Sequence, residues 1–532
     1  MILEFPLADS LGSDSIAGVG GTRHCDWWFA NKAALALALP LTGCFDSQPE
    51  SSEGAVKSEI RVAMMQPPRT GLSPLSDDAF KLSRWSTAET LVNLSPTSEA
   101  EPMLATDWKH VDPLTWQFTV RQGVKFHDGS TLTAESVVNS LQKALEAAPK
   151  PRILDGVDLE VKAMDNYRVE IKTSFDDPLL PSRLSSPQLA ILAASAYQED
   201  GRVSPIGAGT GPFELTEING TTSAKLKRFD GYWGEKAQVE SVIAEYVPNG
   251  FARAAALRTG TADIVEAVPV SQIATIDSNL LYEVAMPRTN TLYLNNKSGV
   301  FSDIELRKVA AAAVDREQIV NTVYENHADI AQGLLGPALA WAEPIRPEGQ
   351  AVDKTLQANG ERIVIGTFTD RAELPEVAAL LKQQLEAAGF KVELDIREYA
   401  QIENDALSGK FDAFILSRAT VLDSGDPVAY MMSDFGCKGS FNLGQFCSQE
   451  VDQALTHADL QPLGAQRQQA IIAVEQKILN DFAAIPLLHE RVIQGESERV
   501  SNVVRDPSER RLVDQTTQVK KATQVNSATQ VN

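Results

Sequence analysis

The 532-residue sequence lacks the features that most enzymes and nucleic-acid-binding proteins need. It has no P-loop, no G-x-S-x-G motif and no H-E-x-x-H motif. The six histidines are scattered, with no pair at the spacing of helical metal ligands. The formal net charge is −23, and no cluster of lysine and arginine is present. Because a phosphate backbone requires a basic surface, nucleic acid is excluded as a partner, and we expect no metal and no cofactor.

Cysteine is also scarce, with only four residues, at Cys25, Cys44, Cys437 and Cys447. The rest of the composition is that of an ordinary soluble protein, with 43% hydrophobic and 22% charged residues. A chain of this length is expected to form about two to four domains.

An apolar run, AALALALPL at residues 33–41, is too short to span a bilayer and has the length of a signal-peptide core. It ends in Leu41-Thr42-Gly43-Cys44, which resembles a bacterial lipobox. That resemblance implies cleavage before Cys44 and lipid attachment to its side chain. The polar stretch at residues 45–58 would be the tether. A short buried core helix is the alternative interpretation of the run.

Export would leave Cys437 and Cys447 as the only thiols of the folded protein, across a short loop. In an oxidising compartment such a pair is more often a disulfide than a metal site. The crosslink would stabilise the fold by roughly 2–3 kcal/mol.

The pattern along the chain alternates between strands and helices. Glu59–Met65 is expected to be a strand, and 86–94 a helix. Residues 115–127 are expected to form a hairpin-like pair. Thr133 is expected to cap a helix that ends near Ala148. A capping box at Ser302 and Glu305 predicts a helix over 303–326.

A second α/β unit begins near Glu361. Strand 362–368, helix 375–388 and strand 391–398 form a parallel βαβ unit. A further strand over 411–416 leads into the loop D-S-G-D-P, which contains Asp423 and Asp426. Ligands of open α/β sheets lie beyond the carboxyl ends of strands, so this loop is a candidate binding loop. A solvated acidic turn is the alternative. A secreted hydrolase that uses this carboxylate pair is a remote one, which an assay for peptide hydrolysis would test.

Three blocks then resemble one family. They are WKHVDPLTWQFTVRQGVKFHDGSTLTAESV (108–137), the set GTGPF, RFDGYWG and ALRTGTADI (209–264), and the set beginning at Leu292 and ending with SDIELRKVAAAAVDR (302–316). In this order they are similar to the bacterial extracellular solute-binding proteins of the dipeptide, oligopeptide and nickel-binding family.

The resemblance implies a two-lobed, type II periplasmic-binding-protein-like α/β fold with a hinge and an extra subdomain in the first lobe. It also implies a monomeric, non-enzymatic capture subunit, anchored on the extracytoplasmic face of the membrane and working with the permease and ATPase of an ABC importer. The expected parts are a signal peptide (1–43), a tether (44–58), lobe I (59–286, subdomain about 85–200), lobe II (287–486), a return to lobe I (487–513) and a disordered tail (514–532).

In peptide-binding members an aspartate in a loop like D-S-G-D-P holds the ligand ammonium, and the matching residue here is Asp423. Arg418 and Arg288 are candidate partners for a ligand carboxylate. Short peptides or similar amino-bearing solutes are therefore the expected ligands.

The chain departs from the family at two positions. Thr420 replaces a tryptophan that peptide binders often carry, and Gln188 stands where nickel-binding relatives carry an arginine. Loss of that arginine disfavours an anionic metal chelate, although an opine-type metallophore also has amino and carboxylate groups and stays the alternative.

Overall fold

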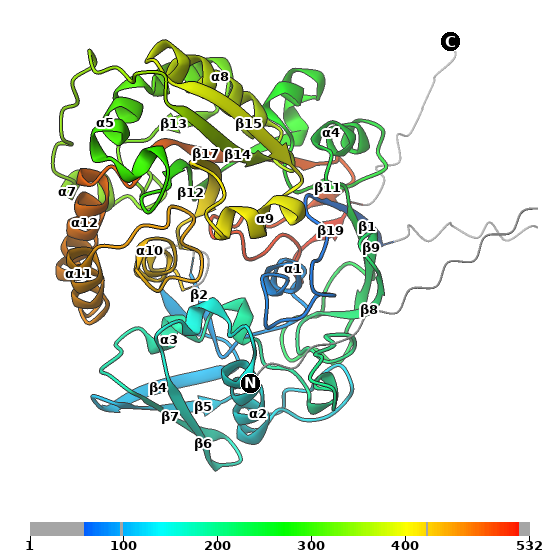
Figure 1. Cartoon of the computed structure of the whole chain (residues 1–532). Helices are drawn as coiled ribbons and strands as arrows, with labels where there is room; N and C mark the ends of the chain where they lie inside the picture. Colours follow the sequence, from blue (N-terminus) through cyan, green and yellow to red (C-terminus); the bar gives the residue numbers. More distant parts are fainter. Residues whose placement is uncertain (1–57, 96–98, 422–423, 521–532) are drawn as a thin grey trace, which may run out of the picture. The chain divides into compact units, whose positions relative to one another are not determined.

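The structure is a computed structural model that describes residues 58–95, 99–421 and 424–520, all within one compact unit (Figure 1). The expectations for the signal peptide, Cys44 and Asp423 concern residues outside these ranges. Among the described residues, no helix is both long enough and apolar enough to cross a membrane.

A large mixed sheet organises the fold. Its strands are, in spatial order, β15 (Lys391–Arg397), β14 (Arg362–Phe368), β16 (Ala413–Ala419), β12 (Leu281–Leu294), β17 (Ala484–Glu496), β11 (Ile264–Val265), β1 (Glu59–Met64), β10 (Ser241–Tyr246), β9 (Ser223–Arg228) and β8 (Phe213–Asn219), with β13 (Ala328–Ile330) paired to β17. We call β11, β1, β10, β9 and β8 the sheet of the first lobe, and β15, β14 and β16 that of the second.

The two lobes share the antiparallel strands β12 and β17, which run from one lobe into the other. Their pairing shifts register between Ala285 and Thr289. Pro287 lies in this irregular stretch, where its missing N–H costs no ladder hydrogen bond. The carbonyl of Pro287 instead accepts hydrogen bonds from the backbone N–H and the hydroxyl of Thr420.

A separate four-stranded antiparallel sheet, in the order β4 (Ala105–Asp112), β5 (Thr115–Val120), β7 (Arg168–Thr173) and β6 (Leu159–Asp165), packs with helix α2 (Ala134–Glu146) around its own core. Thr133 caps α2 through the backbone N–H of Ser136, as predicted. The pattern Trp116, Phe118 and Val120 faces this core because alternate strand residues share one side of the sheet.

The remaining helices cover the sheets (Figure 1). They are α1 (Ala79–Arg84), α3 (Leu180–Arg183), α4 (Gly250–Arg258), α5 (Ile304–Ala313), α6 (Arg316–Thr322), α7 (Ala342–Ile345), α8 (Glu373–Ala387), α9 (Tyr399–Leu407), α10 (Pro427–Phe435), α11 (Gln449–Asp459) and α12 (Ala465–Asn480). Distinct hydrophobic cores lie in the first lobe, in the four-stranded subdomain and in the second lobe.

The predicted βαβ unit over 362–398 is confirmed as β14, α8 and β15. The helix predicted over 86–94 is wrong, because the helix is α1 and Val92–Leu94 is strand β2, paired with β3 (Ala100–Pro102). Ser86 has a φ of 50°, which stops the helix before it.

Two further expectations need correction. Strand β5 pairs with β4 and β7. Residues 121–127 contain turns and one isolated bridge, from Lys125 to Thr131, rather than the second strand of a hairpin. The helix predicted over 303–326 is divided, because Asp315 caps a new helix, α6, by accepting from the backbone N–H of Gln318. Asp303, and not Ser302, caps α5. At the start of each helix, the aspartate side chain accepts a hydrogen bond from a backbone N–H of the first turn.

The tail expected to be disordered from residue 514 is ordered as far as it is described. Strand β19 (Gln518–Val519) pairs with β18 (Val500–Ser501), and Thr517 is buried. Residues 521–532 lie outside the described part.

The stability of the fold is predicted to depend on His489, a buried residue of β17 whose Nδ1 lies 2.9 Å from the Thr289 hydroxyl oxygen. Burial, with a smaller contribution from Arg346, lowers the pKa of His489 from 6.5 to about 4. The folded state therefore resists protonation that the unfolded chain accepts below pH 6.5. Above pH 6.5, His489 is neutral in both states and the protein keeps its full free energy of unfolding. Between pH 6.5 and 4 the free energy of unfolding falls by up to about 3 kcal/mol.

Urea denaturation at pH 7.5, 6 and 4.5 measures this loss. His489→Gln should lose less stability over the same range, whereas His457→Gln, at an exposed position of α11, should behave as wild type. An unchanged pH profile in His489→Gln would show that other groups are responsible.

Candidate functional site

A cavity of about 160 Å³, which we call the interlobe cavity, lies where the two lobes meet. The carboxyl ends of three strands reach it, with Met64 of β1, Phe368 of β14 and Leu416–Ala419 of β16 in its wall. Ligand sites of open α/β sheets lie at such strand ends. Its charged lining residues are Arg69, Asp77, Lys81, Arg84, Arg152, Glu266, Arg288, Arg371, Arg418 and Glu509.

Asp77, just before α1, is the centre of one charged group in this wall. Its carboxylate forms ion pairs with Arg152 and with Arg69, the latter at 3.1 Å. Arg418 and Lys81 lie near enough to act on the same carboxylate. Burial alone would raise the pKa of Asp77, but the four cations outweigh burial and hold the pKa below its ordinary value.

Glu509, in the segment after β17, is the centre of a second group. Arg288 of β12 donates to both of its oxygens, from Nε and Nη2 at 2.5 Å each, and Arg84 of α1 donates from Nη2 at 2.8 Å. Burial disfavours the ionised form, yet Arg288 and Arg84 lower the pKa of Glu509 to about 2. Glu509 is therefore ionised throughout the physiological range.

Three of the arginines are also held against aromatic rings. The guanidinium carbon of Arg69 lies 5.3 Å from the centre of the Tyr399 ring, that of Arg152 5.4 Å from Phe80, and that of Arg418 4.7 Å from Phe441. A cation over a ring face is attracted to it and loses rotational freedom. The wall is thus preorganised, with planar cations in fixed positions.

Both arginines predicted from the sequence, Arg288 and Arg418, line the cavity. Each is already in a bidentate ion pair, Arg288 with Glu509 and Arg418 with Asp434 of α10, at 2.8 and 2.9 Å for the second pair. Each therefore shapes the wall together with its carboxylate.

Asp423 lies outside the described residues, but its neighbour Asp426 is described and has a structural role. The Asp426 carboxylate caps α10 at the backbone N–H of Val428 and accepts from Nε and Nη2 of the buried Arg467 at 2.7 and 2.8 Å. A catalytic role for Asp426 would require this carboxylate to leave both partners.

The two positions that depart from the family lie close to the same wall. Gln188 is buried, and its amide nitrogen Nε2 donates to Asp77 Oδ1 at 3.4 Å. Thr420 is buried, and its hydroxyl donates a hydrogen bond to the carbonyl of Pro287. Threonine has no ring, so this position supplies no aromatic surface. Phe80, Tyr399 and Phe441 supply the aromatic lining instead.

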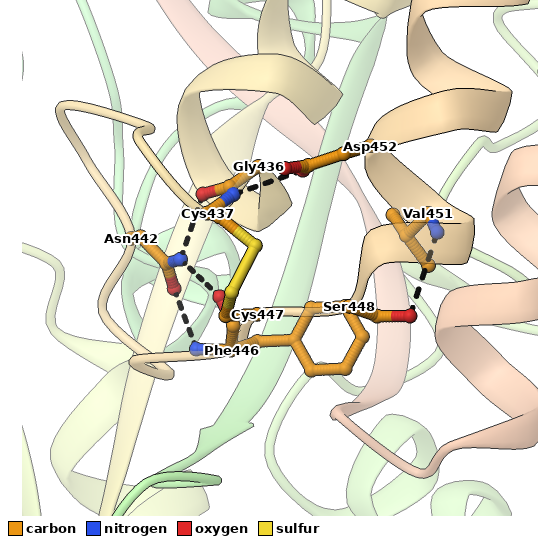
Figure 2. The surroundings of a disulfide bond; sticks show 8 residues. All are labelled: Gly436, Cys437, Asn442, Phe446, Cys447, Ser448, Val451 and Asp452. Carbon is orange, nitrogen blue, oxygen red and sulfur yellow. Dashed lines mark hydrogen bonds between the residues drawn. A yellow bond between two sulfur atoms is a disulfide. The ribbon is translucent and has the colours of Figure 1, made fainter.

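Cys437 and Cys447 form a disulfide with an S–S distance of 2.08 Å (Figure 2). Inside the loop that they close, Asn442 donates from Nδ2 to the carbonyls of Gly436 and Phe446 and accepts from the backbone N–H of Phe446. The same loop carries Phe441, which lies under Arg418 in the cavity wall. The crosslink therefore supports a lining residue.

Sequence reasoning missed most of this wall, including Arg69, Asp77, Arg152, Arg371 and Glu509. These residues come from four separate segments, and none belongs to a motif. What they share is that acidic side chains lie among arginines in the folded protein. This arrangement cannot be read from the sequence, because the residues are distant in the chain. Among the described residues, no group of histidine, cysteine and carboxylate side chains is arranged to hold a metal ion.

The family profile "Bacterial extracellular solute-binding proteins, family 5 Middle" matches residues 99–442 of the chain. The nickel-binding protein NikA of Staphylococcus aureus is 22% identical over 434 residues, which are 79% of this chain and 85% of NikA. The glutathione-binding protein GsiB of Escherichia coli is 24% identical over 413 residues, which are 73% of this chain and 80% of GsiB.

Solved structures share the fold. The structure of NikA from Staphylococcus aureus in complex with Ni(L-His)2 matches with a TM-score of 0.78 and 19% identity, covering 87% of this chain and 100% of that one. The structure of DppA from Helicobacter pylori in complex with the peptide STSA matches with a TM-score of 0.77 and 20% identity, covering 87% and 98%.

A buried ion pair outside the cavity joins the two lobes and carries a prediction. Arg183 of α3 donates from Nη2 to both oxygens of Asp459 at the end of α11, at 2.8 and 3.0 Å, and the two side chains are 4% and 8% exposed. Asp459→Asn removes one of the two carboxylates that hold Arg183, the other being Asp177 at 2.8 Å, and should lower the free energy of unfolding by roughly 1–3 kcal/mol.

Chemical denaturation of Asp459→Asn beside Glu450→Gln tests this expectation. Glu450 is on the same helix, but its 3.3 Å pair with Lys477 is exposed and is worth less than about 1 kcal/mol. Equal stability of the two variants would mean that the buried pair contributes nothing.

Proposed function

Since the chain belongs to the bacterial extracellular solute-binding proteins of family 5, we propose that it captures short peptides or similar amino-bearing solutes in the interlobe cavity. Members of this family are extracytoplasmic components of ABC importers and are not enzymes. They bind the solute and work with the permease and the ATPase of the importer.

The observation that carries the proposal is the composition of the interlobe cavity. Both lobes contribute to its wall, which combines carboxylates, cations and aromatic rings. A peptide has an ammonium, a carboxylate and apolar atoms, and each finds a complementary group in such a wall. Desolvated charges need partners of this kind, because burial without them is costly.

Asp423 is the proposed partner of the ligand ammonium. Residues Leu416–Ala419 of β16 line the cavity, and Asp423 follows Ala419 by four residues of chain. In the sequence, Asp423 is thus close to a strand end that lines the cavity, and this supports the assignment.

The lobes are proposed to close on the solute about β12 and β17. The proposed lobe I comprises 59–286, with its subdomain at about 85–200, and the return segment 487–513; lobe II comprises 287–486. The register shift between Ala285 and Thr289 lies where the shared strands pass between lobes, and an irregular segment absorbs dihedral changes at low cost. The protein is proposed to act as a monomer.

A metal chelate with carboxylate groups, such as an opine-type metallophore, is a second candidate. The arginine-rich wall favours it, even though Gln188 replaces the arginine of nickel-binding relatives. Of the relatives, NikA is named as a nickel-binding protein and GsiB as a glutathione-binding protein.

A ligand screen by thermal shift, followed by calorimetry, tests the function. Di- and tripeptides, nickel with histidine, and opine metallophores should be compared, because a ligand that binds only the folded protein raises Tm by mass action. Asp423→Asn should weaken peptide binding by roughly two to three decades, since the ammonium would lose its charged partner.

Glu450→Gln, at an exposed residue outside the cavity lining, is the matched control and should bind as wild type. The N-acetylated form of the best peptide should bind poorly. Equal affinity for the acetylated and free peptides, or an unchanged affinity in Asp423→Asn, would rule out the ammonium contact.

We further propose lipid attachment at Cys44. Acyl chains anchor a protein by roughly 0.8 kcal/mol per buried CH₂, so Cys44→Ala should be recovered in the soluble fraction after expression in a bacterium. Fractionation with immunodetection of wild type and variant measures it. A variant retained in the membrane fraction to the same extent would contradict lipidation.

A further inference from the structure

The four-stranded subdomain contacts the second lobe through a buried ion pair that lies outside the interlobe cavity. Arg183 of α3 donates from Nη2 to both carboxylate oxygens of Asp459, the last residue of α11, and neither side chain lines the cavity. Leu180 and Leu184 place α3 in the core of the subdomain, whereas Leu455 places α11 in the core of the second lobe. The pair therefore joins two parts of the fold that have separate cores.

Two further contacts lie along the same junction. Ala429 of α10 packs against the core of the subdomain, and the Ser440 hydroxyl donates to the carboxylate of Asp155. Ser440 is exposed, so water competes for this hydrogen bond. Of the three contacts, the pair of Arg183 with Asp459 is the one in which both partners are buried charges.

Each member of the pair also has a partner on its own side of the junction. Arg183 donates from Nε to Asp177 at 2.8 Å, and the backbone carbonyl of Asp177 accepts from Trp116 of the subdomain. Asp459 Oδ1 lies 3.7 Å from Nη2 of Arg467 of α12. Parting of the lobes would thus leave each charge with the partner on its own side. Since the large cost of a buried charge arises when it loses its last partner, this ion pair can break and form again.

The second-lobe side of this contact is connected to the wall of the interlobe cavity. Arg467 donates to the backbone carbonyl of Asp459 at 2.9 Å, and from Nε and Nη2 to Asp426, which caps α10. Near the other end of α10, Asp434 forms a bidentate ion pair with Arg418 of the wall. The position of Arg418 therefore depends, through α10, on the helix end that the subdomain contacts.

We infer that Arg183 and Asp459 are positioning residues for solute capture, and that their ion pair is a reversible latch which slows the release of the solute. The inference rests on the proposed function, because it requires the lobes to part and close about β12 and β17. A solute leaves when the lobes part, so a contact made only between closed lobes lowers the dissociation rate and leaves the association rate unchanged. The apparent affinity then depends on two residues outside the cavity.

Release of trialanine, used as the probe peptide, tests the latch by stopped-flow fluorescence. Asp459→Asn keeps the shape of the side chain and removes its charge, so it should raise the dissociation rate by roughly tenfold as charge-assisted hydrogen bonds across the junction are lost. The association rate should not change. Asp459→Glu, which keeps the charge, should restore part of the slow release.

Asp177→Asn is the matched control, since it also takes one carboxylate from Arg183, but on the subdomain side of the junction. A loss of stability should therefore appear in both asparagine variants, and faster release in Asp459→Asn alone. If Asp459→Asn does not fold, Arg183→Lys replaces it, because an ammonium lacks the planar fork that reaches two carboxylates.

Small-angle X-ray scattering and hydrogen exchange of the solute-free protein add measurements that need no bound peptide. Asp459→Asn should have a larger radius of gyration than the wild type, and the amides of α3 and of the end of α11 should exchange faster by roughly tenfold, with those of α8 unchanged. Asp177→Asn should have the radius of gyration of the wild type.

The outcomes separate the latch from the proposed function. Equal release rates and equal radii of gyration in Asp459→Asn and Asp177→Asn would overturn the latch, and capture of trialanine by the wild type would still support peptide binding. If trialanine does not bind while the radius of gyration distinguishes the two variants, the latch stands and the failure belongs to the proposed function. Faster exchange throughout the protein in Asp459→Asn, α8 included, would show general destabilisation and also overturn the latch.

Discussion

The antiparallel pairing of β12 with β17 is the constraint on which the rest of the structure depends. These two strands carry the chain between the lobes, so the sheets of both lobes are attached to one continuous ladder. The pairing is interrupted by register shifts between Ala285 and Thr289 and between Asn290 and Thr291. The cavity lies beside this junction, because Arg288 of β12 and Ser417 of β16 are in its wall. A site built there receives side chains from both lobes.

Charge is distributed unevenly in this molecule. The acidic residues outnumber the basic ones over the whole chain, yet arginines dominate the cavity lining. Each of those arginines is held by a carboxylate, an aromatic ring or both, as Arg418 is by Asp434 and Phe441. Such support keeps the cations in place before a solute arrives, which lowers the entropy lost on binding.

The loop between Cys437 and Cys447 shows how covalent structure serves the site. The disulfide and the hydrogen bonds of Asn442 order a loop that has few helical or strand hydrogen bonds of its own. Phe441 is thereby kept against Arg418 (Figure 2 shows the loop closure). Near it, Asp426 anchors the start of α10 to Arg467, so the segment that contains the D-S-G-D-P motif is tied to helix α12.

The sequence by itself determined the family, the two-lobed type II fold and the non-enzymatic class, because long motifs and strand periodicity depend on local residue order and are readable without contacts. It also located β14, α8 and β15, and placed Arg288 and Arg418 near the site. Only the tertiary structure decided which residues form the cavity wall. Asp77, Arg152, Arg371 and Glu509 are far apart in the chain, and their common environment arises from the pairing of distant strands. Local patterns also predicted one helix over 303–326, whereas the structure has two, capped by Asp303 and Asp315. The choice between one long helix and two short ones depends on packing against the rest of the fold, which a local pattern does not contain.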